Sequence, residues 1–188
     1  METSMQTFKE IIQSRFLAKS TSIVAGLLRL IPHPANFSSV GGLSIYGGAR
    51  LKGASAFLLP LAIMAITDIL LYFIKGYSPL RGETPFVYGA FLINVLLGKK
   101  FLSNTESPLA IGSVTFAGSV QFFLVTNFGL WLTGGLYTMD MAGLTTCFIA
   151  AIPFFGATLA GDLVFSGLLF AAHHFLARQA FPAEAVSV

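Results

Sequence analysis

Long apolar runs, separated by short polar breaks, extend along the whole chain. The clearest run covers residues 54–74, ASAFLLPLAIMAITDILLYFI, and contains a single charged residue, Asp68. A helix needs about 20 apolar residues to cross the ~30 Å hydrocarbon core of a bilayer. We therefore predict a membrane protein, and each polar residue inside a run must be interpreted with lipid as its surrounding solvent.

The composition agrees with a membrane protein of one domain. Of the 188 residues, 55% are hydrophobic and 10% are charged, whereas soluble domains have about 25% charged residues. The single cysteine, Cys147, excludes an intrachain disulfide and a cysteine-based metal site, so we interpret it as a packing residue. The net charge of +3 comes from scattered basic residues, which indicates membrane topology and argues against nucleic-acid binding.

We predict an all-α fold with six membrane spans, at about residues 16–31, 37–49, 54–74, 85–102, 108–133 and 153–177. The second is too short to span upright, so we expect it to be tilted or shielded by protein. Residues 141–178 would be about 57 Å long as one helix, and we expect Pro153 to separate a short helix, 141–152, from the sixth span. An amphipathic helix, 1–15, precedes the membrane domain, 16–178, and a poorly ordered tail, 179–188, follows it.

The basic residues orient these spans. With six spans and an internal N-terminus, most of them fall on the cytoplasmic side: Lys9, Arg15, Lys19, Arg50, Lys52, Lys99, Lys100 and Arg178. Only Arg29, Lys75 and Arg81 fall outside. Lysine and arginine accumulate in cytoplasmic loops, so we predict a multi-pass protein of the inner (cytoplasmic) membrane with both termini in the cytoplasm.

Motifs of soluble enzymes are absent from the sequence. It has no phosphate-binding Gly-x-x-x-x-Gly-Lys-Ser/Thr loop and no His-Glu-x-x-His motif. His173 and His174 are adjacent, so on a helix their rings point about 100° apart, and we interpret them as anchors at the membrane interface. We expect no catalytic residue, no cofactor and no metal site.

Acidic residues inside the spans need a partner or a function. A charge there costs about 2.5–3.5 kcal/mol on insertion scales and usually faces protein or water. Asp68 and Asp162 either contact a ligand or ion, or make helix-packing hydrogen bonds and pairs with basic residues. Arg29 either pairs with an acid (Asp68, Glu83 or Asp140), or binds an anionic ligand, or extends toward lipid headgroups.

Polar and aromatic residues collect at the predicted outer face, where they would form a small-molecule pocket. Our candidate ligand-binding residues are Arg29, His33, Asn36, Asp68, Tyr77, Arg81, Asn127, Trp131, Tyr137, Asp140 and Phe155. Within the spans, Asn94 and Asn127 are expected to make interhelical hydrogen bonds, with a ligand contact equally open for Asn127. Small residues at four-residue spacing, Ala18, Ser22 and Gly26, favour either packing within the chain or docking of a partner.

The pattern resembles the S components of energy-coupling factor (ECF) vitamin transporters, and most closely an uncharacterised bacterial branch of that superfamily. The likeness covers about residues 24–175. It is carried by the segments GGARLKG (47–53), TDIL (67–70), AAIPFF (150–155), RLIPHPANF (29–37) and SVQFFLVTNFGLW (119–131).

The resemblance implies a vitamin or other micronutrient bound near the outer face, under the loops after spans one, three and five. It also implies a membrane-embedded coupling subunit with two ATPases, docked at Ala18, Ser22 and Gly26. His33, Asn36 and the 127–131 stretch match no vitamin-specific signature, so the ligand stays open. The alternative function is an accessory structural subunit of a larger redox or photosynthetic membrane complex. The binding hypothesis requires a solvent-reachable outer cavity lined by at least three of the candidate residues.

Overall fold

The computed structural model describes residues 16–32, 34–76 and 78–180, and all regular structure within them is helical. The all-α prediction is therefore confirmed. The predicted amphipathic helix over residues 1–15 and most of the predicted tail lie outside the described residues. The helices are Phe16–Leu28, α2 Val40–Arg50, α3 Ser55–Lys75, α4 Thr84–Phe101, α5 Pro108–Thr133 and α6 Met141–Ala180.

Three of the described helices are long and apolar enough to cross a membrane: Ser55–Lys75, Pro108–Thr133 and Met141–Arg178. All three carry large apolar side chains on their surfaces, for example Phe73, Leu109 and Phe175, which are more than half exposed. Contiguous apolar surface of this kind is unfavourable in water and suits hydrocarbon. The prediction of a membrane protein is thus supported by length, composition and exposure together.

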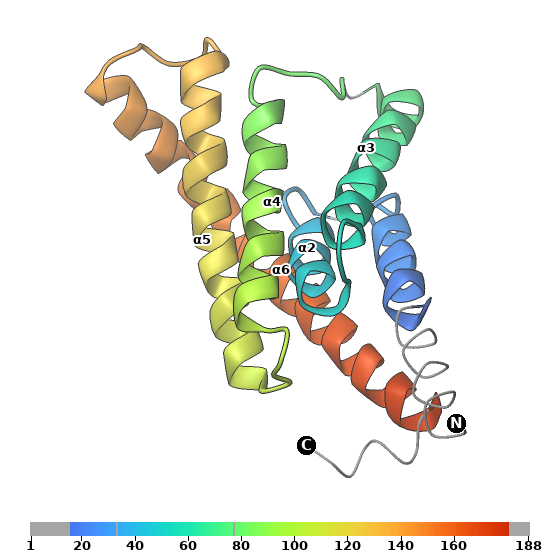
Figure 1. Ribbon diagram of the computed structural model, residues 1–188. Helices are drawn as coiled ribbons and strands as arrows, with labels where there is room; N and C mark the ends of the chain where they lie inside the picture. Colours follow the sequence, from blue (N-terminus) through green and yellow to red (C-terminus); the bar gives the residue numbers. More distant parts are fainter. Residues whose placement is uncertain (1–15, 33, 77, 181–188) are drawn as a thin grey trace.

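Successive helices run in alternating directions (Figure 1). The loops 76–83 and 134–140 lie at the top of Figure 1, which we call the loop end. The loop 102–107 and the C-terminal end of α6 lie at the bottom, and the first helix begins toward the same side; we call this the termini end.

The short helix α2 forms the centre of the bundle. Its 11 residues reach about 16 Å, and residues Val40 to Ala49 are all buried beneath α3, α4, α5 and α6. Glycine makes this packing possible: a Cβ on Gly48 would collide with the Val95 carbonyl, and one on Gly98 with the Ile45 carbonyl. Of the two alternatives for the second segment, the structure shows shielding by protein.

Helix α6 differs from the prediction. It continues through Pro153 as one helix of 40 residues, about 60 Å long, and runs diagonally across the bundle (Figure 1). Proline removes one backbone donor but does not have to end a helix whose neighbours and lipid surroundings keep the remaining hydrogen bonds intact. The predicted division into residues 141–152 and 153–177 is therefore not observed.

The acid Asp162 in α6 makes a packing contact. Its side chain is 4% exposed, accepts a 2.7 Å hydrogen bond from Ser119 Oγ, and lies against Gly41 and the Gly42 N–H at the start of α2. An acidic group at a helix N-terminus interacts favourably with the helix dipole. Of the two roles left open by the sequence, the structure shows helix packing.

Tyr46 connects three helices through its hydroxyl. The Tyr46 hydroxyl lies 2.8 Å from Thr21 Oγ1 in the first helix and 2.8 Å from His173 Nδ1 in α6. The interpretation of His173 as an interfacial anchor is wrong, because it is buried in this contact. His174 is partly exposed and contacts Glu106 at 2.6 Å.

Two further predictions concern packing between helices. Asn94 makes the expected interhelical bond, accepting from Gln121 Nε2 at 2.8 Å. Ala18 and Ser22 are fully buried, and a side chain at Gly26 would collide with Ile63. In the structure these small residues bring helices of the same chain close together, which is the first of the two alternatives, and docking of a partner stays a prediction.

Candidate functional site

An ion pair joins the residue that follows the first helix, Arg29, to Asp68 in α3. Arg29 Nη2 lies 2.6 Å from Asp68 Oδ1, with side chains 19% and 16% exposed. Arg29 Nη1 also donates to Thr67 Oγ1 at 2.7 Å. Tyr88 in α4 donates its hydroxyl to Asp68 Oδ2 at 3.0 Å. Both oxygens of the carboxylate are thus occupied, and the ion pair is one of the alternatives that the sequence left open for Arg29.

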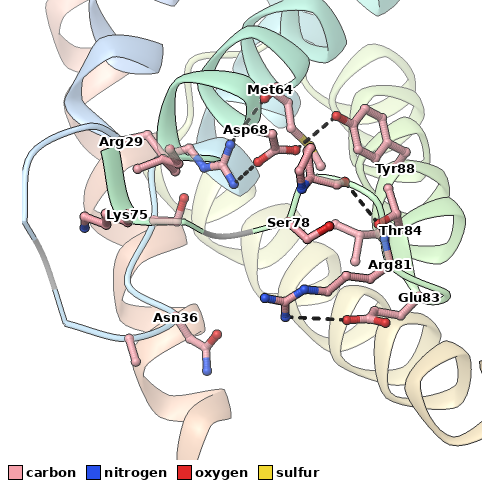
Figure 2. A pocket seen from close by; sticks show the side chains of 15 residues that line it. Arg29, Asn36, Met64, Asp68, Lys75, Ser78, Arg81, Glu83, Thr84 and Tyr88 are labelled. Carbon is pink, nitrogen blue, oxygen red and sulfur yellow. Dashed lines mark hydrogen bonds and ion pairs between the residues drawn. The ribbon is translucent and has the colours of Figure 1, made fainter. Parts of the chain in front are cut away.

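This ion pair borders a cavity of about 630 Å³ between α3 and α4 (Figure 2). Pockets for small molecules usually measure about 300–1,000 Å³. The lining residues are Arg29, Ala35, Asn36, Ser38, Met64, Asp68, Leu71, Lys75, Ser78, Pro79, Arg81, Glu83, Thr84, Val87 and Tyr88. Four predicted ligand residues, Arg29, Asn36, Asp68 and Arg81, therefore surround one cavity.

The loop above the cavity is positioned by local backbone chemistry. Gly76 ends α3 with a left-handed φ of 72° and donates its N–H to the Tyr72 carbonyl, an arrangement that glycine adopts without strain. Pro85 stands in the first turn of α4, where its missing N–H has no helical partner to lose. The chain between these two signals places Ser78, Pro79 and Arg81 over the space between the helices.

The lining has more basic than acidic side chains: Arg29, Lys75 and Arg81 against Asp68 and Glu83. Because Arg29 and Asp68 neutralise each other, Lys75 and Arg81 provide the remaining positive charge. Arg81 is 56% exposed, and its Nη1 lies as far as 3.9 Å from Glu83 Oε1. An exposed ion pair at this separation is weak. The cavity thus suits a ligand with a negative group.

The other described candidates lie apart from this cavity, on α5, α6 and the loop between them. Asn127 Nδ2 donates to the Phe123 carbonyl of its own helix at 2.8 Å. Phe155 packs on Phe123 with ring centroids 5.3 Å apart. Trp131 Nε1 donates to the Thr138 carbonyl at 2.9 Å. None of these residues lines the cavity, so the structure brings only part of the predicted set together, and a ligand role for the others stays a prediction.

Asp140 begins α6 as a capping residue. Its Oδ1 accepts from the Gly143 N–H at 2.7 Å and from the Thr138 hydroxyl at 2.8 Å. The Gly143 N–H, followed by the Thr138 hydroxyl, holds the pKa of this carboxyl below its usual value. Asp140 thereby serves the helix start. Tyr137 lies half-buried in the same loop, away from the cavity lining.

Two candidates, His33 and Tyr77, lie outside the described residues. Conversely, the sequence analysis missed Tyr88 and Lys75 as site residues. Tyr88 had a detectable signal, because a carboxylate within a span requires hydrogen-bond donors on neighbouring helices. In the described part of the chain, no group of three or more His, Cys, Asp or Glu residues is arranged to hold a metal ion.

Comparisons with known proteins add a family match and nothing more specific. A family model described as "Family of unknown function (DUF6580)" matches residues 10–184. No curated protein and no solved structure matches the chain.

Proposed function

The chain belongs to the DUF6580 family, whose function is unknown, and we propose that it is a membrane protein that binds a small polar solute. The observation that carries the proposal is the cavity of about 630 Å³ bounded by the Arg29–Asp68 pair, Arg81 and Tyr88. Ionisable groups are costly inside a membrane protein and mark ligand or ion sites when they face a water-filled space.

For the topology we propose six membrane segments with both termini in the cytoplasm of a bacterial cell and the loop end outside. The alternating course of the helices supports this orientation (Figure 1). So does the charge distribution, because Lys52, Lys99, Lys100 and Arg178 belong to the termini end. In this orientation the cavity opens to the external face.

The proposed role is uptake of a micronutrient, in the manner of the ECF S components that the sequence resembles. The excess of basic over acidic lining residues favours a solute with a carboxylate or phosphate group. Ala18 and Ser22 are buried within the chain, so we propose that a coupling subunit with ATPases would dock on a neighbouring exposed surface.

A second candidate, an accessory subunit of a larger membrane complex, is favoured by one observation. The first part of α6 presents large apolar side chains to the outside, including Met141 at 74%, Ile149 at 61% and Ile152 at 61% exposure. Such a surface suits a neighbouring protein helix as well as lipid. In this case the cavity would be incidental.

The experiment that separates the two combines native mass spectrometry with ligand-dependent thermal stability. The purified protein is screened against anionic, zwitterionic and cationic micronutrients. A ligand at 100 times its Kd stabilises the folded state by about 2.7 kcal/mol. We expect stabilisation by an anionic or zwitterionic compound that is reduced in Arg81→Gln and retained in Lys52→Gln, the matched control at the other end.

The opposite result would be equally clear. A protein that no compound stabilises, and that retains stoichiometric protein partners under mild solubilisation, would be a structural subunit.

A further inference from the structure

A second cavity lies between α5 and α6 toward the termini end, where α6 runs away from the lower part of α5 (Figure 1). We call it the α5–α6 groove. Its volume is about 520 Å³. The lining residues are Glu106, Pro108, Ile111, Gly112, Thr115, Leu163, Ser166, Gly167, Phe170, Ala171, His174 and Phe175. They recur at helical spacing, so each helix contributes one face.

Two glycines provide the space in the groove. A Cβ built on Gly112 or on Gly167 would meet no atom within 4 Å, whereas one on Gly48 in the bundle centre would collide with a backbone carbonyl. Gly112 and Gly167 are therefore not needed for close packing of these helices. Their effect is to leave room between the two walls.

The charged groups of the groove lie at its mouth, and its walls are apolar apart from two hydroxyls. Glu106 and His174 form its mouth at the termini end, joined by a 2.6 Å contact between Glu106 Oε2 and His174 Nδ1. The side walls are mainly apolar, and Phe170 and Phe175 contribute aromatic surface. Deeper in the walls, Thr115 and Ser166 are buried, and their hydroxyls have no hydrogen-bond partner among the described residues. This distribution is amphipathic.

The charges at the mouth compensate one another. Arg50 lies 3.6 Å from Glu106 and donates to the carbonyls of Leu102 and Thr105. The opposite charges of Arg50 and Glu106 offset each other, so the mouth offers hydrogen-bond donors and acceptors beside a compensated ion pair. An uncharged, hydrogen-bonding headgroup matches these groups, and an anionic headgroup would face the Glu106 carboxylate.

The volume also limits the occupant. An α-helix is about 10–12 Å across and rises 5.4 Å per turn, so a space of about 520 Å³ holds little more than one turn of helix. It is instead within the range of small-molecule pockets. A single hydrocarbon chain entering from the surrounding lipid fits both the volume and the apolar walls.

We propose that the α5–α6 groove binds a single-chain lipid alcohol, with its chain between Gly112 and Gly167 and its hydroxyl at Glu106 and His174. This site is independent of the solute cavity, which lies at the opposite end of the bundle. Its occupant comes from the membrane.

The test uses the full-length protein in phosphatidylcholine vesicles with a long-chain fatty alcohol that carries a photoreactive diazirine near its chain end. In the wild type we expect cross-links to map to the groove faces of α5 and α6. The Gly112→Leu/Gly167→Leu variant fills the groove and should lose them. Gly89→Leu/Gly156→Leu is the matched control, because a Cβ at either of these glycines also meets nothing within 4 Å and neither lines the groove; it should be labelled like the wild type.

Three results would overturn the proposal. Cross-links spread evenly over the exposed faces of α3, α5 and α6 in the wild type would show ordinary lipid contact, and this readout needs no variant to fold. A second contrary result is that the Gly112→Leu/Gly167→Leu variant is still labelled but loses a protein that co-purifies with the wild type. The groove would then bind a helix of that partner. Equal labelling by the matching fatty acid would reject the uncharged headgroup.

Discussion

The two cavities at opposite ends of the bundle differ in what lines them. The cavity between α3 and α4 is bordered by five charged side chains, of which Arg29 and Asp68 form a tight pair. The α5–α6 groove has mainly apolar walls, with the hydroxyls of Thr115 and Ser166 within them and Glu106 and His174 at its mouth. Cavities of similar volume in one bundle can therefore differ in the ligand that they favour. The lining of the first suits a water-soluble ion, and that of the second suits a hydrocarbon chain.

The strongest test of this contrast compares one substitution in each cavity. Asp68→Leu removes the carboxylate of the Arg29 ion pair. We expect about 2 kcal/mol of destabilisation, which is below the ~3–5 kcal/mol of fully buried pairs because both side chains reach solvent. Gly112→Leu adds a side chain to open space and should leave stability nearly unchanged. Thermal denaturation in detergent measures both. Equal losses would mean that the groove is already filled by protein.

Tyr88→Phe tests whether the polar groups of the α3–α4 cavity act together. Removing the hydroxyl that donates to Asp68 should reduce the free energy of unfolding by about 1 kcal/mol. Combined with Asp68→Leu, the loss should be smaller than the sum of the two single losses, because both variants disrupt one network. Strict additivity in the double-mutant cycle would show that Tyr88 acts independently.

Salt should distinguish the two sites by affinity. Arg81 is 56% exposed, and at 0.15 M ionic strength charges are screened beyond about 8 Å. We therefore expect binding of an anionic solute to weaken several-fold as salt rises, whereas photolabelling by the fatty alcohol should not change. Titrations at low and high ionic strength provide the measurement. A salt-independent solute affinity would exclude Lys75 and Arg81 from recognition.

The smallest expected effect concerns Asp140, which belongs to neither cavity. Hydrogen bonds from Gly143 and Thr138 lower its pKa in the folded protein, so the stabilisation is present above the unfolded pKa, near 3.9, and is lost as the pH falls through the folded pKa. Asn can cap a helix but does not titrate. The stability advantage of the wild type over Asp140→Asn should therefore shrink on acidification below about pH 4, measured by thermal scans. A constant difference would mean that the carboxylate is not bonded in the folded state.

Part of the fold was predictable because apolar runs of sufficient length have few alternatives in lipid. The helices over residues 54–74 and 108–133 were predicted almost to the residue, since an unbroken run can satisfy its backbone hydrogen bonds only as a helix. Pro153 was misjudged, because whether a proline ends a helix depends on neighbours that lie outside the local sequence.

The candidate site was predictable only in part for a similar reason. A charge such as Arg29 or Asp68 inside an apolar run signals by itself that it needs a partner. Trp131 and Asp140 gave the same polar signal, yet each makes its hydrogen bond with a residue nearby in the sequence. The position of a polar residue near one end of a span therefore does not show whether its side chain lines a cavity or bonds to a residue nearby in the sequence.

The sequence by itself determined the helical class, the apolar surfaces and the need of Asp68 for a partner, because these follow from local composition and from the cost of exposing polar groups to lipid. The packing of the helices in space settles which partner Asp68 has, that α2 is buried at the centre, and where the two open cavities lie. These outcomes depend on how closely helices can approach, which small residues far apart in the sequence set together at points such as Gly48 and Gly98.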